Sequence, residues 1–247
     1  MLIATFVLCL PIRASDNIDS IKAKAEQGDA KAQCNLGLCY AKGDGVAKDE
    51  VEAVKWYRKS AEQGNAVAQV NLGKCYKWGT GVAKDDVEAV KWYRKSAEQG
   101  VATAQYNLGT RYASGTGVAK DEVEAVKWFR KSAEQGYAVA QYHLGVGYAF
   151  GTGVAKDEVE AVKWFRKSAE QGDATAQHNL GFCYANGIGV EKDEVEAYAF
   201  YNLSGINYDK ARSARDELEK KMASSQVVEG QRRTKELKAK LANRWEN

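Results

Sequence analysis

The residues of this 247-residue chain that could act chemically are two histidines, five cysteines and a set of regularly spaced serines. His143 and His178 occupy positions whose residue type changes between copies of one repeated segment, so no base accompanies the serines at a fixed spacing. A serine nucleophile needs such a base to remove its proton. We therefore predict that the protein is not an enzyme. The recurring serines are Ser60, Ser96, Ser132 and Ser168.

The cysteine spacing does not predict a metal centre. No Cys-x-x-Cys pair occurs, and two histidines are too few to complete a zinc site. Cys39, Cys75 and Cys183 share one position of the repeated segment, where stacked helix pairs place side chains about 8–10 Å apart, beyond the reach of a disulfide. We expect these three to be free, half-buried thiols. A disulfide framework among the five cysteines, which include Cys9 and Cys34, is the less favoured alternative.

The composition favours an all-helical chain without a nucleic-acid partner. Proline occurs once, at Pro11, whereas glycine occurs 23 times, so helices run uninterrupted between glycines. The net charge is only +3 and charges of opposite sign alternate, which argues against a surface for nucleic acid or an anionic membrane. Gly43-Asp44-Gly45 joins two predicted helices, whereas a nucleotide-binding loop joins a strand to a helix, so we predict no cofactor.

Residues 1–14 resemble a secretory signal peptide. Leu2 to Leu10 form an apolar run that is followed by Pro11 and the small residue Ala14. No Lys or Arg precedes the run, and it is too short to span a bilayer, so no stable membrane span is predicted. If the segment is a signal peptide, the protein is periplasmic or secreted. If it is a disordered leader or a misassigned start, the protein is cytoplasmic.

Most of the chain consists of one repeated segment. The sequence from Lys55 to Gly64 recurs almost unchanged in copies that end at Gly100, Gly136 and Gly172, each 36 residues after the last. A half copy, residues 15–28, precedes them and is expected to cap the N-terminal end. The full repeats are residues 29–64, 65–100, 101–136, 137–172 and a divergent 173–208.

Each repeat is predicted to form two helices separated by glycines. The first helix, near residues 30–42, ends at the paired Gly43 and Gly45, which permit the positive φ values of a tight reversal. Its apolar residues follow helical spacing. They are Ala32, Leu36 and Tyr40.

The second helix is predicted to begin after Asp49. This residue is a natural N-cap, and Glu52 three residues later completes the pattern of a capping box. Arg58 and Glu62 have the i, i+4 spacing of an ion pair, which indicates a solvated outer face.

The identity of the recurring residues adds a family resemblance. In the first repeat they are Ala30, Ala32, Gln33, Leu36, Gly37, Tyr40, Gly43, Gly45, Val46, Asp49, Ala53, Trp56, Ser60, Ala61 and Gly64. This pattern resembles the Sel1-like repeat, a relative of the tetratricopeptide repeat, and it covers about three quarters of the chain. The resemblance implies a right-handed α/α solenoid that serves as a non-catalytic scaffold or adaptor for other proteins.

The fifth repeat departs from the pattern, which predicts a cap. Phe200 replaces the tryptophan and Gly205 an alanine, and apolar residues replace the charged ones of the second helix. Such a surface needs a cover, so residues 209–247 are predicted to form capping helices near 209–222 and 226–245. The last helix would place three apolar residues on one face, namely Leu237, Leu241 and Trp245.

The repeats differ from one another along one stripe of the first helix. Positions equivalent to 32, 33, 36, 37, 40 and 43 are identical, and we interpret them as packing, with Trp56 facing Gly37. Positions equivalent to 31, 34, 38 and 42 vary and are often aromatic. Aromatic residues dominate interface energetics, so the stripe is the predicted partner surface, although drift on a solvated face would also produce variation.

The predicted function is to bind another protein or an extended peptide, as a monomer, in a concave groove lined by the first helices. Asparagines beside the stripe would bond the peptide backbone, or equally each would only bond a neighbouring loop. The alternative function is binding of cell-envelope glycans or peptidoglycan fragments, for which aromatic platforms would also serve. The predicted partner-binding residues are Val70, Asn71, Lys74, Trp78, Tyr106, Asn107, Tyr142, Phe150, His178 and Phe182.

Overall fold

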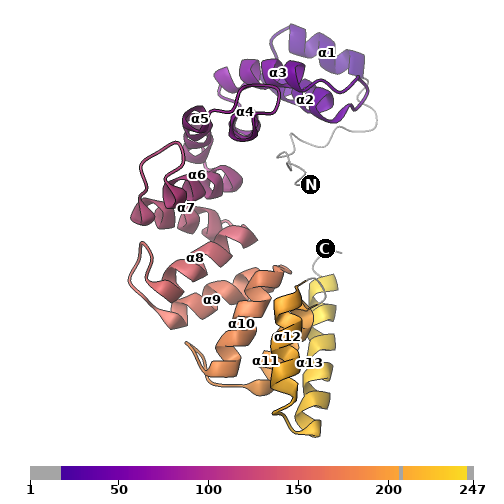
Figure 1. Ribbon diagram of the computed structural model, residues 1–247. Helices are drawn as coiled ribbons and strands as arrows, with labels where there is room; N and C mark the ends of the chain where they lie inside the picture. Colours follow the sequence, from indigo (N-terminus) through magenta and orange to yellow (C-terminus); the bar gives the residue numbers. More distant parts are fainter. Residues whose placement is uncertain (1–17, 206–207, 244–247) are drawn as a thin grey trace. The chain divides into compact units, whose positions relative to one another are not determined.

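The structure, a computed structural model, describes residues 18–205 and 208–243. Within these ranges the chain forms thirteen α-helices and no strand, which confirms the all-α prediction (Figure 1). The predicted signal peptide and the predicted place of Trp245 lie outside the described residues. The helices are α1 (Ile18–Glu26), α2 (Ala30–Lys42), α3 (Glu50–Glu62), α4 (Ala66–Trp78), α5 (Asp86–Glu98), α6 (Ala102–Ser114), α7 (Glu122–Glu134), α8 (Ala138–Phe150), α9 (Glu158–Ala169), α10 (Ala174–Asn186), α11 (Glu194–Ser204), α12 (Asp209–Glu219) and α13 (Ser224–Asn243).

The start of each second helix depends on an aspartate, as the first repeat shows. The side chain of Asp49 accepts a hydrogen bond from Glu52 N at 3.0 Å, so the predicted N-cap is confirmed. The reciprocal bond of a capping box does not form. Asp49 N donates instead to Tyr40 O at 2.9 Å, and the Glu52 carboxylate pairs with Lys55 at 2.8 Å. The loop therefore folds back on to the end of the first helix.

A glycine in each first helix lets the second helix of the same repeat approach closely. A Cβ built on Gly73 would lie 2.7 Å from the ring of Tyr93, which is closer than atoms can come. Gly37 stands in the same relation to Tyr57, so the prediction that Trp56 faces Gly37 is wrong by one residue. Glycine within a helix costs about 1 kcal/mol, and the buried ring that it admits offsets that cost.

Glutamine and serine side chains tie the helices together. Gln69 Nε2 donates to Ala61 O of the preceding second helix at 3.1 Å, and Gln69 Oε1 accepts from Gln99 of its own repeat at 2.8 Å. Ser96 Oγ donates to Ala66 O at 2.8 Å. The recurring serines are thus buried groups bonded to the backbone or, like Ser132, fully enclosed.

An arginine of each of the first four second helices reaches a tyrosine of the following repeat. The predicted ion pair of Arg58 with Glu62 is wrong, because Arg58 Nη2 donates to the Tyr76 hydroxyl at 2.6 Å. Each guanidinium carbon also lies 5.5 to 5.7 Å from the centroid of the tyrosine ring. The other pairs at the same hydrogen-bond distance are Arg94 with Tyr112, Arg130 with Tyr148 and Arg166 with Tyr184.

The second glycine of each loop allows contact with the preceding repeat. Gly81 has a φ of 68°, and a Cβ on it would lie 2.0 Å from Glu50 O. Gly117 approaches Asp86 O in the same way, at 2.1 Å. Glycine is therefore required twice over, for its positive φ and for its missing side chain.

The chain consists of two compact parts, one ending at Trp128 and one beginning at Phe129, so the division falls inside α7. In the N-terminal part a continuous core extends from α2 to α7 and includes Leu72, Tyr93 and Leu108. In the C-terminal part a core extends from α9 to α12.

Helix α1 occupies the place of a second helix ahead of the first repeat. Its residues Ile21 and Ala25 are buried against α2 together with Leu36. Gln33 Nε2 donates to Ala25 O at 3.1 Å, the same bond that Gln69 makes to Ala61.

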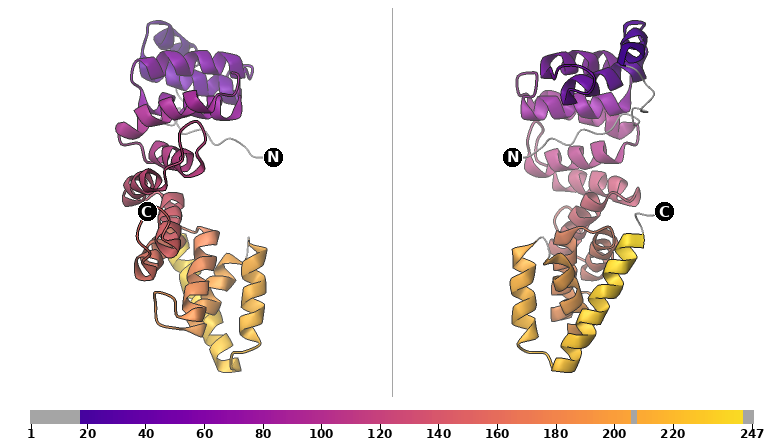
Figure 2. Two further views of the ribbon diagram at one scale, coloured as in Figure 1. Left: turned by 60° about the vertical axis from the view of Figure 1, so that its left-hand side comes forward. Right: turned by 90° about the vertical axis from the view of Figure 1, so that its right-hand side faces the viewer.

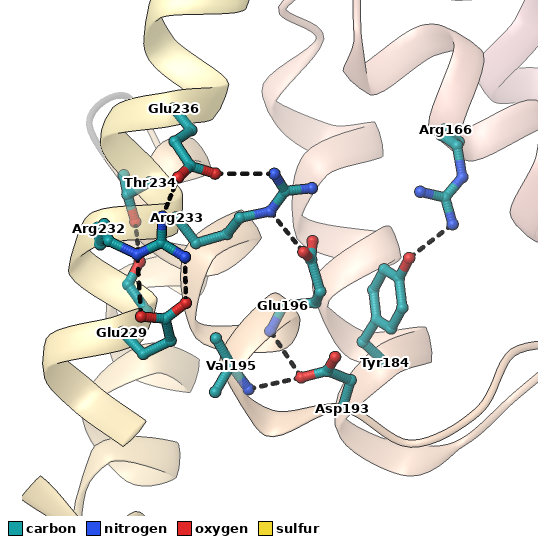
Figure 3. A network of polar contacts seen from close by, with 11 residues as sticks. Arg166, Tyr184, Asp193, Val195, Glu196, Glu229, Arg232, Arg233, Thr234 and Glu236 are labelled. Carbon is teal, nitrogen blue, oxygen red and sulfur yellow. Dashed lines mark hydrogen bonds and ion pairs between the residues drawn. The ribbon is translucent and has the colours of Figure 1, made fainter. Parts of the chain in front are cut away.

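Helices α12 and α13 are joined by a short turn and diverge from it, and each packs against α11 (Figure 2). A Cβ on Gly230 of α13 would lie 2.6 Å from the ring of Tyr198, so the two helices are in close contact. Arg233 of α13 forms ion pairs with Glu196 of α11 and with Glu236 (Figure 3). Four large apolar residues of α11 are buried, namely Tyr198, Phe200, Tyr201 and Leu203.

The cysteines that share one repeat position are free, as predicted, but they are buried and not half-buried. Burial raises the pKa of the Cys75 thiol to about 12 and that of Cys183 to about 11, so both remain protonated at neutral pH. Cys34 is disulfide-bonded, and Cys9 lies outside the described residues. None of the helices in the described ranges has the length and apolar content that a membrane crossing requires.

Candidate functional site

In the N-terminal part, two of the predicted partner-binding residues lie inside the protein. Val70 and Asn71 of α4 have no exposed surface, and Val70 belongs to the same core as Leu72. A side chain without exposed surface cannot contact a partner, so these two predictions are wrong. The prediction used only the angular position of each residue around the axis of its own helix. That position does not show that neighbouring elements enclose this face of α4.

The other predicted residues of this part reach the surface. Trp78, the last residue of α4, is 52% exposed, and Lys77 Nζ lies 4.5 Å from the centroid of its ring. Lys74 lies one turn earlier and is partly exposed. Tyr106 and Asn107 of α6 are half-buried. These four form the accessible portion of the predicted stripe between residues 66 and 114.

Beside Trp78 lies a cluster of cations that the comparison of repeats did not single out. Arg111 of α6 is only 9% exposed, and its Nη1 lies 3.1 Å from Asp86 Oδ1. Lys84 Nζ lies 3.4 Å from the other carboxylate oxygen, Asp86 Oδ2. Arg111 Nε is buried without a hydrogen-bond partner, and Lys77 makes no ion pair with any described residue. Asp86 is thus shared between cations that outnumber it.

The sequence did contain a signal for this cluster. The position of Lys77 is alanine in every other repeat, and the position of Arg111 is cysteine or glycine. Asp86 stands where the other repeats have glutamate. These positions lie outside the stripe that the four most variable positions of the first helix predict.

Burial disfavours the charged forms of Lys74 and Lys77. Burial, followed by the neighbouring charge of Lys77, lowers the pKa of Lys74 to about 8. Burial, followed by the charge of Arg111, also lowers the pKa of Lys77. An anion placed beside these ammonium groups would favour their charged forms.

In the C-terminal part, the stripe begins as a partly buried aromatic cluster. The rings of Tyr142 and His143 meet edge to face at 5.3 Å. His143 stacks on Phe129 at 5.2 Å, and Tyr142 lies 5.9 Å from Phe165. Burial lowers the pKa of His143, so its imidazole is neutral at neutral pH.

His178 of α10 is also held by aromatic neighbours. Its ring lies 5.6 Å from Tyr201 and 5.2 Å from Tyr208. Its Nδ1 lies 3.2 Å from Oδ1 of Asn179, the next residue of the same helix, so this contact involves no neighbouring loop. His178 and Tyr142 contribute to packing as well as to the surface.

The remaining stripe residues of this part are solvent-exposed aromatics. Phe150, the last residue of α8, is 76% exposed, and Phe182 of α10 is 50% exposed. Trp78 occupies the position equivalent to Phe150 in α4. Large aromatic side chains such as Trp78 are the kind that anchor protein interfaces.

A second apolar row lies on the second helices, and the sequence comparison missed it because its residues do not vary. Each valine of this row is between 52% and 55% exposed. The row is therefore a rival to the stripe as a docking surface. Its members are Val51, Val87, Val123 and Val159.

A pocket of about 270 Å³ lies between α9, α11 and α13 in the C-terminal part. Phe200, Leu203 and Leu237 are among its apolar lining residues. The arginines at its rim are already engaged, Arg166 with the Tyr184 hydroxyl and Arg233 with Glu196 (Figure 3). The pocket is therefore a gap in the packing of the cap and offers no unpaired arginine to a ligand.

Comparison with protein families identifies the repeats. The Sel1 repeat family model matches residues 30–65, 66–101, 102–137, 138–173 and 174–205. Sel1 repeat proteins generally act in protein–protein interaction.

Solved structures with the same architecture include two of high similarity. The crystal structure of c5321, a protective antigen of uropathogenic Escherichia coli with an SLR fold, is 41% identical with a TM-score of 0.86. The match covers 92% of this chain and 49% of c5321. A Sel1 repeat protein from Oxalobacter formigenes is 40% identical with a TM-score of 0.74, over 81% of both chains.

A curated relative is the secretory immunoglobulin A-binding protein EsiB of Escherichia coli O6:H1, which is 42% identical over 61 residues. That match covers 24% of this chain and 12% of EsiB. The chain thus spans about half the length of c5321, and its match to EsiB is a small part of that protein.

Proposed function

Because this chain belongs to the Sel1 repeat family, whose members generally act in protein–protein interaction, we propose that it is a non-catalytic scaffold that binds a partner polypeptide along the first helices of its repeats. The observation that carries this proposal is the exposure of large aromatic side chains on those helices. Trp78 and Phe150 occupy equivalent positions at the ends of α4 and α8, and both expose more than half of their surface. Aromatic anchors of this kind supply most of the binding free energy of protein interfaces.

The spacing of the repeats suits an extended partner. Equivalent side chains of packed helices recur about every 10 Å, which is close to three residues of extended chain at about 3.3 Å each. A partner strand would therefore meet one repeat for every three of its residues. Within the N-terminal part the proposed contacts are Trp78 and Tyr106, and within the C-terminal part, taken by itself, they are Tyr142, Phe150 and Phe182.

The names of the relatives suggest in which cellular location this chain binds its partner. EsiB binds secretory immunoglobulin A by its name, and c5321 is described as a protective antigen. We propose by analogy that this chain is exported through residues 1–14 and meets a protein outside the cytoplasm.

A capture experiment with matched variants tests the proposal. The wild-type chain is used to capture a partner from extracellular and envelope fractions, and the affinity for that partner is then measured for two double variants. Trp78→Ala with Tyr106→Ala should weaken binding by at least about 30-fold, since each interface anchor is worth roughly 2 kcal/mol. Val51→Ala with Val87→Ala removes as many side chains from the second helices of the same part and should leave the affinity nearly unchanged.

The opposite ranking would move the binding surface to the second helices. A glycan array performed in parallel distinguishes protein binding from the alternative function, which is glycan binding. Binding to glycans or peptidoglycan fragments, without capture of any protein, would replace the proposal.

A further inference from the structure

The first helices α8 and α10 of the C-terminal part carry no charged side chain. Neither contains a Lys, Arg, Asp or Glu. Each first helix of the N-terminal part has a cation in its last turn, namely Lys42 of α2, Lys77 of α4 and Arg111 of α6. Such a cation stabilises a helix because it faces the negative end of the helix dipole. Helices α8 and α10 lack this contribution.

Large apolar side chains occupy the exposed face of these two helices. On α8, Tyr142, Val146 and Phe150 follow one another at i, i+4 and i+8 and therefore lie on one face. Phe150 stands where α2 has Lys42, and it is 76% exposed. On α10 the residue equivalent to Val146 is Phe182, which is 50% exposed. Two large rings are thus presented to solvent on helices without charge.

Side-chain contacts join the two helices into one surface. A hydrogen bond links Tyr142 of α8 to Asn179 of α10, and Asn179 Oδ1 lies 3.2 Å from Nδ1 of the adjacent His178. The His178 ring lies 5.2 Å from that of Tyr208, the residue before α12. Tyr142, Val146 and Tyr208 pack, partly buried, against one core. The members of this α8–α10 surface are Tyr142, Val146, Phe150, His178, Phe182 and Tyr208.

The α8–α10 surface offers a partner few polar groups. Asn186 Nδ2 is engaged, because it donates to Phe182 O at 2.9 Å. A charge that acts on Tyr142 is that of Asp173, the N-cap of α10, whose carboxylate accepts from Ala176 N at 2.7 Å. This carboxylate stands at the start of α10, whereas Phe182 lies about two turns farther along. A charged group beside Phe182 would therefore find no opposite charge on α8 or α10.

We propose that the α8–α10 surface binds an uncharged, apolar segment of the partner polypeptide. This inference rests on the proposed function and adds the chemistry of the partner at the C-terminal part. Apolar residues of the partner leave water when they pack against Phe150 and Phe182, which favours binding. A Lys, Arg, Asp or Glu at the same place loses hydration without gaining an ion pair, which costs free energy.

The absence of cations favours a polypeptide over a membrane as the occupant. Anionic lipid headgroups attract clustered Lys and Arg, and α8 and α10 contain neither. The surface also lies on the same first helices along which the proposed partner binds. One partner can therefore meet both the polar and the apolar members of the stripe.

Four peptide probes test the inference on the full chain. Each is a short fluorescein-labelled peptide in which Leu alternates with Asn, and its central residue is Leu, Gln, Glu or Lys. Fluorescence anisotropy measures the affinities. The wild-type chain should bind the Leu peptide about tenfold more tightly than the Gln peptide, and the Gln peptide more tightly than either charged one. The preference for Leu over Gln should not change with salt, because no ion pair contributes to it.

Two double variants locate the binding. Phe150→Ser with Phe182→Ser removes both exposed rings and should weaken binding of the Leu peptide at least about tenfold. The matched control, Val159→Ser with Val228→Ser, removes two exposed apolar side chains of α9 and α13 in the same part. It should change the affinity by less than about twofold. Thermal unfolding verifies that both variants are folded.

A single variant should reverse the preference for charge. Phe150→Lys installs the residue that α2 has at the equivalent position, Lys42, and position 150 is exposed enough to accept it. This variant should bind the Glu peptide more tightly than the Lys peptide, and the difference should shrink as salt rises. An unchanged ranking of the two charged peptides would mean that they do not bind beside residue 150.

Several further results would overturn the inference. These are equal affinity for the Leu and Glu peptides, no binding of any peptide, and equal losses in the two double variants. Binding to neutral lipid vesicles, or self-association in sedimentation, that the Phe150 and Phe182 variant abolishes would also overturn it, because the surface would then serve a membrane or a second copy of the chain.

None of these results removes the proposed function, which is judged by capture of a protein partner and by the Trp78 and Tyr106 variant. Conversely, a captured partner whose affinity that variant leaves unchanged would remove the proposed function even where the peptide preference holds.

Discussion

Trp92 shows at the scale of one residue how the scaffold is held together. Its side chain is buried, its indole N–H has no hydrogen-bond partner, and Lys95 Nζ lies 4.4 Å from the centroid of its ring. Its contribution to stability is therefore packing. Trp92→Ala should lower the free energy of unfolding by about 3–5 kcal/mol, because it leaves a cavity in the core.

The control for this prediction is Trp92→Phe, the residue that the fifth repeat uses at Phe200. It fills most of the volume without a buried N–H and should cost less than about 1.5 kcal/mol. Thermal unfolding followed by circular dichroism measures both variants. An alanine variant as stable as the phenylalanine variant would contradict the packing role.

Lys74 should lower the free energy of unfolding at neutral pH, and this destabilisation should decrease as pH rises. Its pKa is lowered on folding, so the folded state disfavours the charged form, and the penalty is full below about pH 8 and disappears as pH rises towards the ordinary lysine value. Lys74→Leu should therefore unfold at a higher temperature than wild type at pH 7, and the difference should narrow at pH 9.5. The thiols and tyrosines that also titrate contribute equally to the stability of both chains, so their contributions cancel in the difference between the two unfolding temperatures. A difference that is constant or grows with pH would contradict the assignment.

Each hydrogen bond between an arginine and the tyrosine of the next repeat should contribute modestly. Tyr112→Phe removes the hydroxyl that Arg94 contacts at 2.6 Å and should lower the free energy of unfolding by about 1 kcal/mol. In a double-mutant cycle with Arg94→Ala, the two losses should be non-additive, because both remove the same bond. Additive losses would mean that the bond contributes nothing in solution.

At the scale of the elements, α12 and α13 are needed to cover the apolar surface of α11. Removal of residues 209–247 should expose Tyr198, Phe200, Tyr201 and Leu203 while leaving the N-terminal part folded. Sedimentation should then show aggregation at a temperature where circular dichroism still shows helix. A truncated chain that stays monomeric would mean that α11 needs no cover.

The helices themselves could be predicted from single residues, because glycine and aspartate mark their ends by local geometry. Gly43 and Asp49 bound the loop of the first repeat as expected. The residues that pass between helices could not be predicted in the same way. Helical spacing predicts that Arg58 pairs with Glu62 on its own helix and gives no sign of the Tyr76 hydroxyl that the next repeat supplies.

At the scale of the whole molecule, sequence comparison predicted the repeat architecture but only part of the candidate site. The exposed Trp78, Phe150 and Phe182 were found because bulky residues stand out among varying positions. The burial of Val70 and Asn71 could not be predicted from the sequence, because the exposure of a residue depends on how neighbouring elements pack around its helix.

Site-specific photo-crosslinking tests the central claim most directly. A photoreactive phenylalanine analogue replaces Trp78 or Phe150 on the first helices, or Val87 or Val159 on the second helices, and each chain is irradiated with its captured partner. All four positions are about half or more exposed, so accessibility alone favours neither surface. Binding along the first helices predicts crosslinks from positions 78 and 150 and few from positions 87 and 159. Crosslinks confined to positions 87 and 159 would contradict it.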